Sequence, residues 1–119
     1  MIDKKEIKRK YKETIQPMGI YQIRNLVNNK VFIGSSKNLT AKFNSYKFQL
    51  KQRTFMNSLL QADYNNFGEE SFAFEIIDYL KPVDDLSYDY TKDLETLLEL
   101  WLDKIQPFDE KGYHTKKPG

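Results

Sequence analysis

Apolar residues recur along this chain with two different periods, and these periods separate its strands from its helices. In GIYQIRNLVNNKVFIGSS, residues 19–36, isoleucine, tyrosine and valine alternate with polar residues. The alternation predicts two short strands near 19–26 and 30–34. Asn28-Asn29 predicts a two-residue turn between them, because asparagine tolerates the positive φ that such turns require. SFAFEIIDYL, residues 71–80, is rich in aromatic and branched residues and predicts a third strand.

Helical spacing predicts two helices before the middle of the chain. Asp3 can cap a first, basic helix that Pro17 ends. Asn38 can cap a second helix over 39 to about 51. The apolar stripe of this second helix has the spacing i, i+4, i+7 and i+11. Its members are Leu39, Phe43, Tyr46 and Leu50.

Two further helices follow. A third helix, about 55 to 67, is predicted to turn Leu60, Tyr64 and Phe67 inward and to end at Gly68. A last helix, about 92 to 105, carries the strongest apolar stripe of the chain. The residues of that stripe are Leu94, Leu97, Leu98, Trp101, Leu102 and Ile105.

The order α-β-β-α-α-β-α predicts a single α/β (α+β) domain with a three-stranded antiparallel sheet and helices packed on it. A chain of 119 residues has the size of one domain. We expect an N-terminal basic helix at 1–17, the domain itself at 18–114 and a tail at 115–119.

Composition narrows the class of protein. The chain contains no cysteine, which excludes a disulfide framework and a thiolate zinc site. It has no apolar run long enough to cross a bilayer and no signal peptide behind its charged N-terminus. The sequence therefore predicts a soluble cytoplasmic protein with no membrane partner, and it leaves the oligomeric state open.

Charge is distributed unevenly along the chain. Residues 1–53 hold 13 Lys and Arg against 3 Asp and Glu, a net charge of +10, whereas residues 54–119 hold 6 against 14, a net charge of −8. Such a chain can present one basic face, and basic faces most often meet phosphate. Alternatively, the two halves neutralise each other in the fold.

The hairpin carries a family resemblance. Gly19-Ile20-Tyr21 and Phe32-Ile33-Gly34 are separated by ten residues, and NSLLQADYNNFGEESFAFEII and a closing GYH follow. In these segments the chain resembles the GIY-YIG nuclease family, in particular its intron-homing branch, from about residue 18 to 114. The resemblance implies a GIY-YIG-like domain and phosphodiester hydrolysis with one Mg²⁺ or Mn²⁺ ion.

In that family a hairpin tyrosine helps to activate water, an arginine on the next helix steadies the phosphate, and a glutamate on the last helix holds the metal. The resemblance places five candidate catalytic positions in this chain, and only the first keeps the family's residue type. They are Tyr21, Phe32 for the second tyrosine, Lys42 for the arginine, Tyr46 for a histidine and His114 for an asparagine. Phenylalanine cannot relay a proton, and lysine cannot grip a phosphate bidentately.

The metal glutamate of the family falls on Leu98, which cannot bind a metal. Two neighbouring carboxylates could replace it. Glu95 lies one helical turn before Leu98, about 60° around the helix, and Glu99 lies about 100° away. Either one is a candidate metal ligand.

These departures predict a nucleic-acid-binding protein that is catalytically weakened or inactive. An active divalent-metal-dependent DNA endonuclease that uses a neighbouring carboxylate is the alternative, and a protein-interaction module on the same fold is a further one. The expected partner is nucleic acid, in particular DNA, bound weakly and without sequence preference. We expect four basic residues to border one groove beside Tyr21, namely Arg24, Lys37, Lys42 and Lys47.

Overall fold

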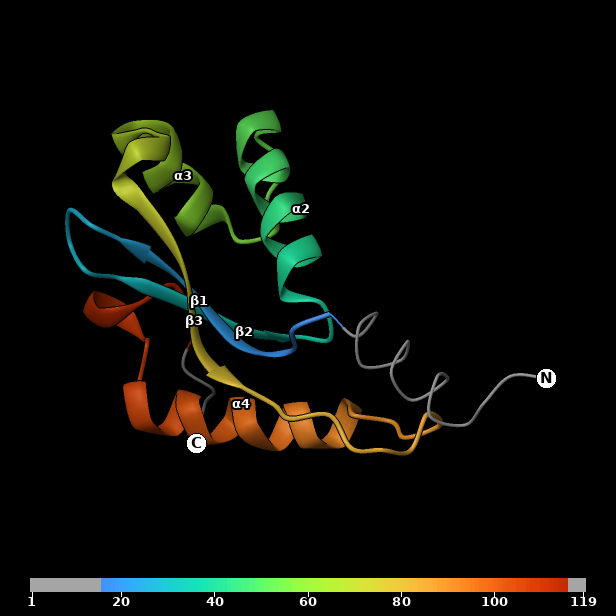
Figure 1. Cartoon of the computed structure of the whole chain (residues 1–119). Coiled ribbons are helices and arrows are strands. Elements are labelled where there is room, and N and C mark those ends of the chain that lie inside the picture. The colour runs from blue at the N-terminus through green and yellow to red at the C-terminus, as the bar shows by residue number, and fades with distance from the viewer. Residues whose placement is uncertain (1–15, 116–119) are drawn as a thin grey trace.

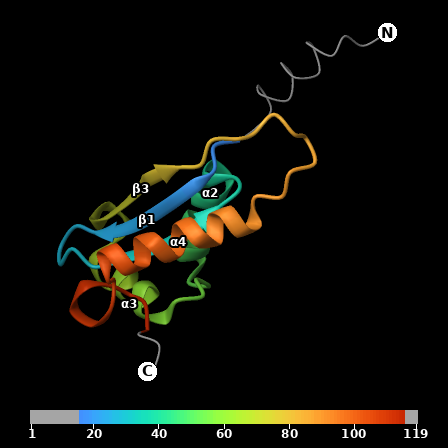
Figure 2. The ribbon, with the colours of Figure 1, turned by 90° about the horizontal axis from the view of Figure 1, so that it is seen from below.

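A computed structural model describes residues 16–115, which form a central sheet with helices on both of its faces (Figure 1). The strands are β1 (Gly19–Asn25), β2 (Val31–Ser36) and β3 (Phe72–Tyr79). The helices are α2 (Leu39–Gln52), α3 (Ser58–Phe67) and α4 (Thr91–Ile105), with short 3₁₀ turns at Glu69–Ser71 and Asp109–Lys111. Helices α2 and α3 cover one face of the sheet, and α4 crosses the other face (Figures 1 and 2).

The sheet has the order β2-β1-β3, and both of its strand pairs are antiparallel. Tyr21 of β1 stands opposite Gly34 of β2, and the pairing of β1 with β3 shifts register between Ile20 and Tyr21. The predicted mixed α/β class and the three-stranded antiparallel sheet are therefore confirmed. The predicted N-terminal helix at 1–17 falls almost entirely outside the described residues.

Alternation along the strands divides the core between the two faces. The cluster under α2 and α3 contains Tyr21, Ile23 and Phe32 from the sheet. The cluster under α4 contains Ile20, Val31 and Ile33, and the apolar stripe of α4 packs against it. Successive side chains of a strand point to opposite faces, so the short hairpin supplies both layers of the core.

The hairpin connection is longer than a two-residue turn, so that prediction was wrong. Five residues, 26–30, join β1 to β2, and the backbone N–H of Asn25 donates to the carbonyl of Lys30 at 2.9 Å. Asn29 has a positive φ of 63°, as asparagine readily accepts. The Asn25 side chain accepts from the Val27 N–H, which holds the extra residues in place.

Asparagine caps begin both helices on the upper face. Asn38 accepts a side-chain hydrogen bond from the Ala41 N–H, and Asn57 accepts one from the Leu60 N–H. The predicted cap of α2 is confirmed. Phe67 was predicted to turn inward, but its side chain is exposed, and it is the last residue of α3.

The segment after α4 returns to the free edge of β2. The N–H of Tyr113 donates to the Val31 carbonyl at 3.1 Å, and the buried Tyr113 hydroxyl donates to Asp63 at 2.7 Å. Asn25 donates to the same hydroxyl at 3.0 Å. These bonds fix the position of His114, the next residue. Among residues 16–115, no helix is long and apolar enough to span a membrane.

Candidate functional site

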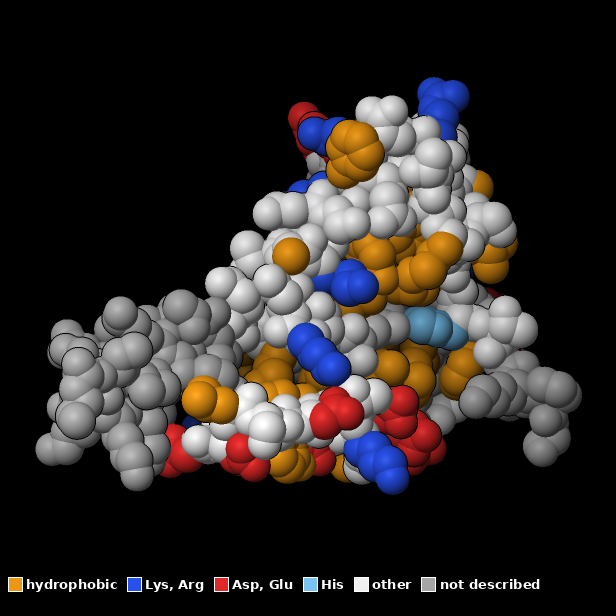
Figure 3. Space-filling view, turned by 90° about the vertical axis from the view of Figure 1, so that its right-hand side faces the viewer, with side chains coloured by type: hydrophobic (Ala, Val, Ile, Leu, Met, Phe, Trp, Pro, Cys, Tyr) orange, Lys and Arg blue, Asp and Glu red, His pale blue; other side chains and the backbone are white. Residues whose placement is uncertain are grey.

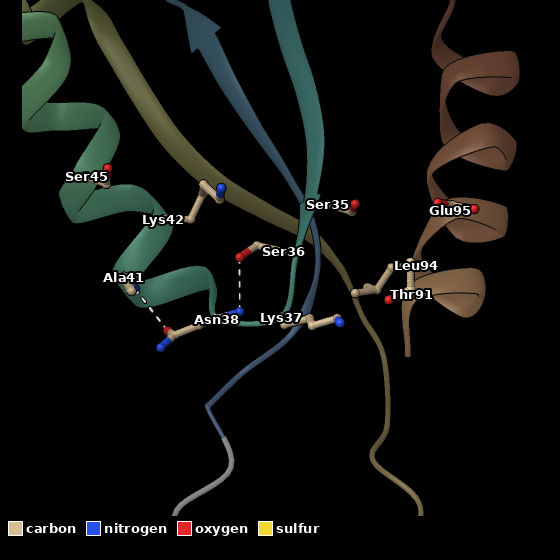
Figure 4. A pocket seen from close by; sticks show the side chains of 10 residues that line it. All are labelled: Ser35, Ser36, Lys37, Asn38, Ala41, Lys42, Ser45, Thr91, Leu94 and Glu95. Atoms are coloured by element: carbon tan, nitrogen blue, oxygen red, sulfur yellow. Dashed lines mark hydrogen bonds between the residues drawn. The ribbon is translucent and has the colours of Figure 1, made fainter. Parts of the chain in front are cut away.

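A groove of about 570 Å³ opens between the first turns of α2 and of α4, at the end of β2 (Figure 4). One wall combines the end of β2 with the side of α2, and the other wall is α4. The polar side chains around it are hydroxyls, two lysines, one amide and one carboxylate. They are Ser35, Ser36, Lys37, Asn38, Lys42, Ser45, Thr91 and Glu95.

The two walls carry opposite charges. Lys42 stands on the α2 wall, with its ammonium 5.2 Å from the centre of the Tyr46 ring. Lys37 precedes α2, and its exposed ammonium lies 3.5 Å from Asp89. Glu95 faces them from α4 (Figure 4). A groove with this arrangement can attract a phosphate to its lysine side and a cation to its carboxylate.

The start of α2 offers little free backbone to an anion. Ser36 accepts from the Asn38 N–H at 3.0 Å, and the Leu39 N–H donates to the Pro17 carbonyl at 2.8 Å. The Ala41 N–H donates to the Asn38 side chain. Because these donors are already paired, attraction of a phosphate depends on the lysine and serine side chains rather than on the helix terminus.

Tyr21 lies behind the groove instead of lining it. Its side chain is 2% exposed, and its hydroxyl donates to the Tyr46 hydroxyl at 3.1 Å. Burial, and then the bond to Tyr46, raise the pKa of Tyr21 far above its ordinary value. The ring lies across Gly34, where a β-carbon would collide with the hydroxyl of Tyr21. The glycine therefore gives this tyrosine its buried position.

Phe32 and His114 form a stacked pair beside β2. Their ring centres are 4.9 Å apart and their planes differ by 9°. Nε2 of His114 accepts the Ile33 N–H at 2.8 Å, so the imidazole takes the place of a strand partner at this edge. Burial lowers the pKa of His114. The histidine is held in its neutral form, because Nε2 can accept this bond only when it carries no proton.

The structure separates the two candidate metal carboxylates. Glu95 lines the groove with Lys42. Glu99 lines a different cavity, of about 400 Å³, together with Asp103 and His114. Leu98 is half-buried and packs on the cluster under α4. Of the two candidates, only Glu95 shares a cavity with the lysines.

The four basic residues do not share one groove, so that expectation was wrong for two of them. Arg24 lies three residues after Tyr21 on β1, so its side chain points to the opposite face of the sheet. Its Nε is 2.8 Å from Oε1 of Glu75. Lys47 lies over the Phe74 ring, at 5.1 Å, on the far side of α2. Only Lys37 and Lys42 border the groove.

The sequence interpretation missed the hydroxyl groups of the groove. Ser35 and Ser36 directly follow the second half of the hairpin motif, and Ser45 lies three residues after Lys42 on one side of α2. Ser45 could have been found from its helical spacing to Lys42, and Ser35 and Ser36 from their place directly after the hairpin motif. Thr91 could not, because it comes from the first turn of α4, far away in sequence.

The face that contains the groove also contains the histidine. Figure 3 shows the pale blue histidine on the same face as basic side chains, with hydrophobic side chains exposed beside them. Acidic side chains lie along the lower edge of this view. On this face, the basic side chains near the histidine thus lie above a mainly acidic edge.

This fold occurs in solved structures of nuclease domains. The catalytic domain of homing endonuclease I-TevI has a TM-score of 0.67 and 24% sequence identity, over 84% of this chain and 99% of that chain. A point mutant of the catalytic domain of intron endonuclease I-TevI has a TM-score of 0.69 and 24% identity, over 83% and 93%. The fold is therefore that of a homing-endonuclease catalytic domain.

Sequence comparison gives the family. The family model of the GIY-YIG catalytic domain matches residues 17–107, and the chain belongs to this family. Intron-associated endonuclease 1 of Enterobacteria phage T4 is 35% identical over 65 residues, which cover 53% of this chain and 26% of the phage protein. The match thus spans about a quarter of that relative.

Proposed function

We propose that this protein binds the phosphodiester backbone of nucleic acid in the groove between α2 and α4, and that it hydrolyses that backbone slowly or not at all. The proposed partner is DNA, bound weakly and without sequence preference. One observation carries the proposal: the groups suited to binding line the groove, whereas the hairpin's aromatic positions are buried behind it.

The binding half of the proposal rests on the two lysines. Lys37 and Lys42 flank the same cavity, and the serine hydroxyls beside them can donate to phosphate oxygens. Lysine is a point charge that attracts phosphate without reading bases, which supports binding without sequence preference. Two lysines give few phosphate contacts, which supports weak binding.

The weak hydrolysis rests on two positions of the hairpin. A general base must reach the proton that it takes, but the hydroxyl of Tyr21 is buried and already bonded to Tyr46. Phe32 has no hydroxyl. Loss of one preorganised electrostatic contact commonly lowers a rate by about 100- to 1000-fold, so the combined losses should leave hydrolysis near background.

Salt dependence of binding tests this proposal. We expect the affinity for DNA to fall between about 50 and 200 mM salt with a log–log slope near 0.9 per phosphate neutralised on duplex. Lys42→Ala and Lys37→Ala should each reduce that slope by about 0.9, the value for one phosphate contact. Lys81→Ala, an exposed lysine outside the groove, is the matched control and should leave the slope unchanged. Binding that ignores salt would refute the proposal.

Metal-dependent cleavage is the second candidate, and the position of Glu95 favours it. Within residues 16–115, no group of three or more acidic, histidine or cysteine side chains could hold a metal by itself. Mg²⁺ is commonly bound by one or two carboxylates together with substrate phosphates. The donor set therefore fits a cation shared between Glu95 and a phosphate near Lys42. When bound, Mg²⁺ or Mn²⁺ would polarise the phosphate.

The two candidates differ in one measurement. If cleavage is retained through Glu95, then Glu95→Gln abolishes it and Glu99→Gln does not, because Glu99 lines another cavity. If the first candidate holds, both variants bind DNA and neither the parent nor the variants cut it. Nicking by the parent that survives Glu95→Gln contradicts both candidates.

A further inference from the structure

Phe48 stands on the surface of α2 with no apolar cover among the described residues. Its side chain is 64% exposed, although it is flanked by the buried residues Tyr46 and Leu50. A phenylalanine in this position leaves one large aromatic surface facing water. Figure 3 shows that hydrophobic side chains lie exposed on the same face as the lysines.

The position of Phe48 continues the groove along α2. Ala41, Ser45 and Phe48 have the spacing i, i+4 and i+7, which aligns them on one stripe of the helix. Ala41 and Ser45 line the groove. With a rise of about 1.5 Å per residue, Phe48 stands about 4.5 Å along the helix axis from Ser45. The aromatic ring therefore lies one helical turn beyond the serine that lines the groove.

The charge of α2 suits a polyanion. The helix contains Lys42, Lys47 and Lys51 and no aspartate or glutamate. Across the groove, α4 presents the carboxylate of Glu95. A phosphate chain is therefore attracted to α2 and repelled by α4, so the strand that leaves the groove should follow α2 past Phe48.

We propose that Phe48 is a stacking platform for one unpaired base of a strand whose phosphate lies in the groove beside Ser45. This inference rests on the proposed function and deepens it, because it names single-stranded nucleic acid as the preferred partner. In a duplex both faces of an interior base are covered by its neighbours, so it offers no face to an exposed ring. Aromatic stacking accepts any base, which agrees with binding without sequence preference.

The test compares a single-stranded oligonucleotide of mixed sequence with the duplex of the same length, by fluorescence anisotropy at one low salt concentration. Stacking on one aromatic side chain is worth about 1–3 kcal/mol per base, which is about a 5- to 150-fold loss of affinity. Phe48→Ala should show this loss for the single strand and less than about twofold for the duplex. Met56→Ala, at 66% exposure, is the matched control and should change neither affinity.

A second variant reports the contact directly. The chain has a single tryptophan, Trp101, which lies on α4. In Phe48→Trp, the additional emission should be quenched when the single strand is added and should not change with the duplex. Unchanged affinity in Phe48→Ala, or equal losses for both DNA forms, would overturn the inference and leave the proposed function standing. Absence of binding by the parent to either form would overturn both.

Discussion

The hydroxyl groups of Tyr21 and Tyr46 are joined by a hydrogen bond of 3.1 Å behind the groove. Both rings are buried, and they meet edge to face with their centres 5.7 Å apart. The hydroxyl of the first tyrosine of the family motif therefore forms a hydrogen bond with a residue of α2. In this chain it joins the hairpin to the helix that carries the lysines.

This bond predicts an unusual order of stabilities. Tyr21→Phe or Tyr46→Phe alone leaves one buried hydroxyl without its partner, which costs about 1–3 kcal/mol. Replacing both by phenylalanine removes both polar groups and should be nearly neutral. Urea unfolding should rank the double variant as more stable than either single variant. Additive losses in the double variant would show that the two hydroxyls do not depend on each other.

Gly34 should be intolerant of even one added carbon. A β-carbon there collides with the Tyr21 ring, so we expect Gly34→Ala to lower the free energy of unfolding by about 1–3 kcal/mol. Gly68→Ala is not a matched control, because Gly68 has a positive φ of 90°. A Tyr21→Leu background provides the control instead. There, Gly34→Ala should cost clearly less, and an equal cost in both backgrounds would contradict this explanation.

His114 should make stability depend on pH. Its pKa is lowered in the folded state, chiefly by burial, so the unfolded chain binds the proton more readily. The free energy of unfolding is therefore highest well above the ordinary histidine pKa of 6.5. It falls as the pH decreases through that value toward the lowered pKa of the folded state. Chemical unfolding at about pH 7.5 and about pH 5.5, on either side of the ordinary histidine pKa, should show the loss.

His114→Gln is the control for this pH dependence, because glutamine can still accept the Ile33 N–H but does not titrate. Since the chain has a single histidine, the difference in stability between the two pH values should nearly vanish in this variant. The carboxylates with altered pKa, Glu75, Asp85 and Asp89, are shifted downward and titrate at lower pH. The same loss in His114→Gln would assign the effect to another group.

Rebuilding the family's residues should restore cleavage. We expect the triple variant Leu98→Glu, Lys42→Arg, Phe32→Tyr to nick plasmid DNA in Mg²⁺ or Mn²⁺. Because Leu98 packs on an apolar cluster, the new carboxylate should also lower stability, so folding is checked by circular dichroism. The same triple variant with Leu98→Gln is the control and should not nick. A folded triple variant without activity would show that Leu98 is not the decisive loss.

Much of the fold could be predicted from local pattern. Asn38 precedes an apolar stripe at helical spacing, and it does cap α2. The alternation around Tyr21 and Ile33 predicted both hairpin strands, whereas the division of the core between two faces appears only in the structure. The five-residue connection at 26–30 was missed, because the Asn28-Asn29 pair fits a tighter turn as well.

The site was predicted less well, and part of the error could have been avoided. Lys47 follows Lys42 by five residues, about 140° around the helix, and Arg24 follows Tyr21 by three along a strand, so periodicity alone already separates each pair. The stacking of His114 on Phe32 could not be predicted from the sequence. It joins residues far apart in sequence and depends on how the segment after α4 returns to the edge of β2.

Binding of DNA without cleavage can be tested in one sample. Supercoiled plasmid is saturated with the unaltered protein at low salt in Mg²⁺ or Mn²⁺, and half is run directly on a gel and half after removal of the protein. We expect a shifted complex in the first half and intact supercoiled plasmid in the second. Nicked or linear plasmid that disappears in Glu95→Gln would contradict it and would identify Glu95 as the residue that holds the metal.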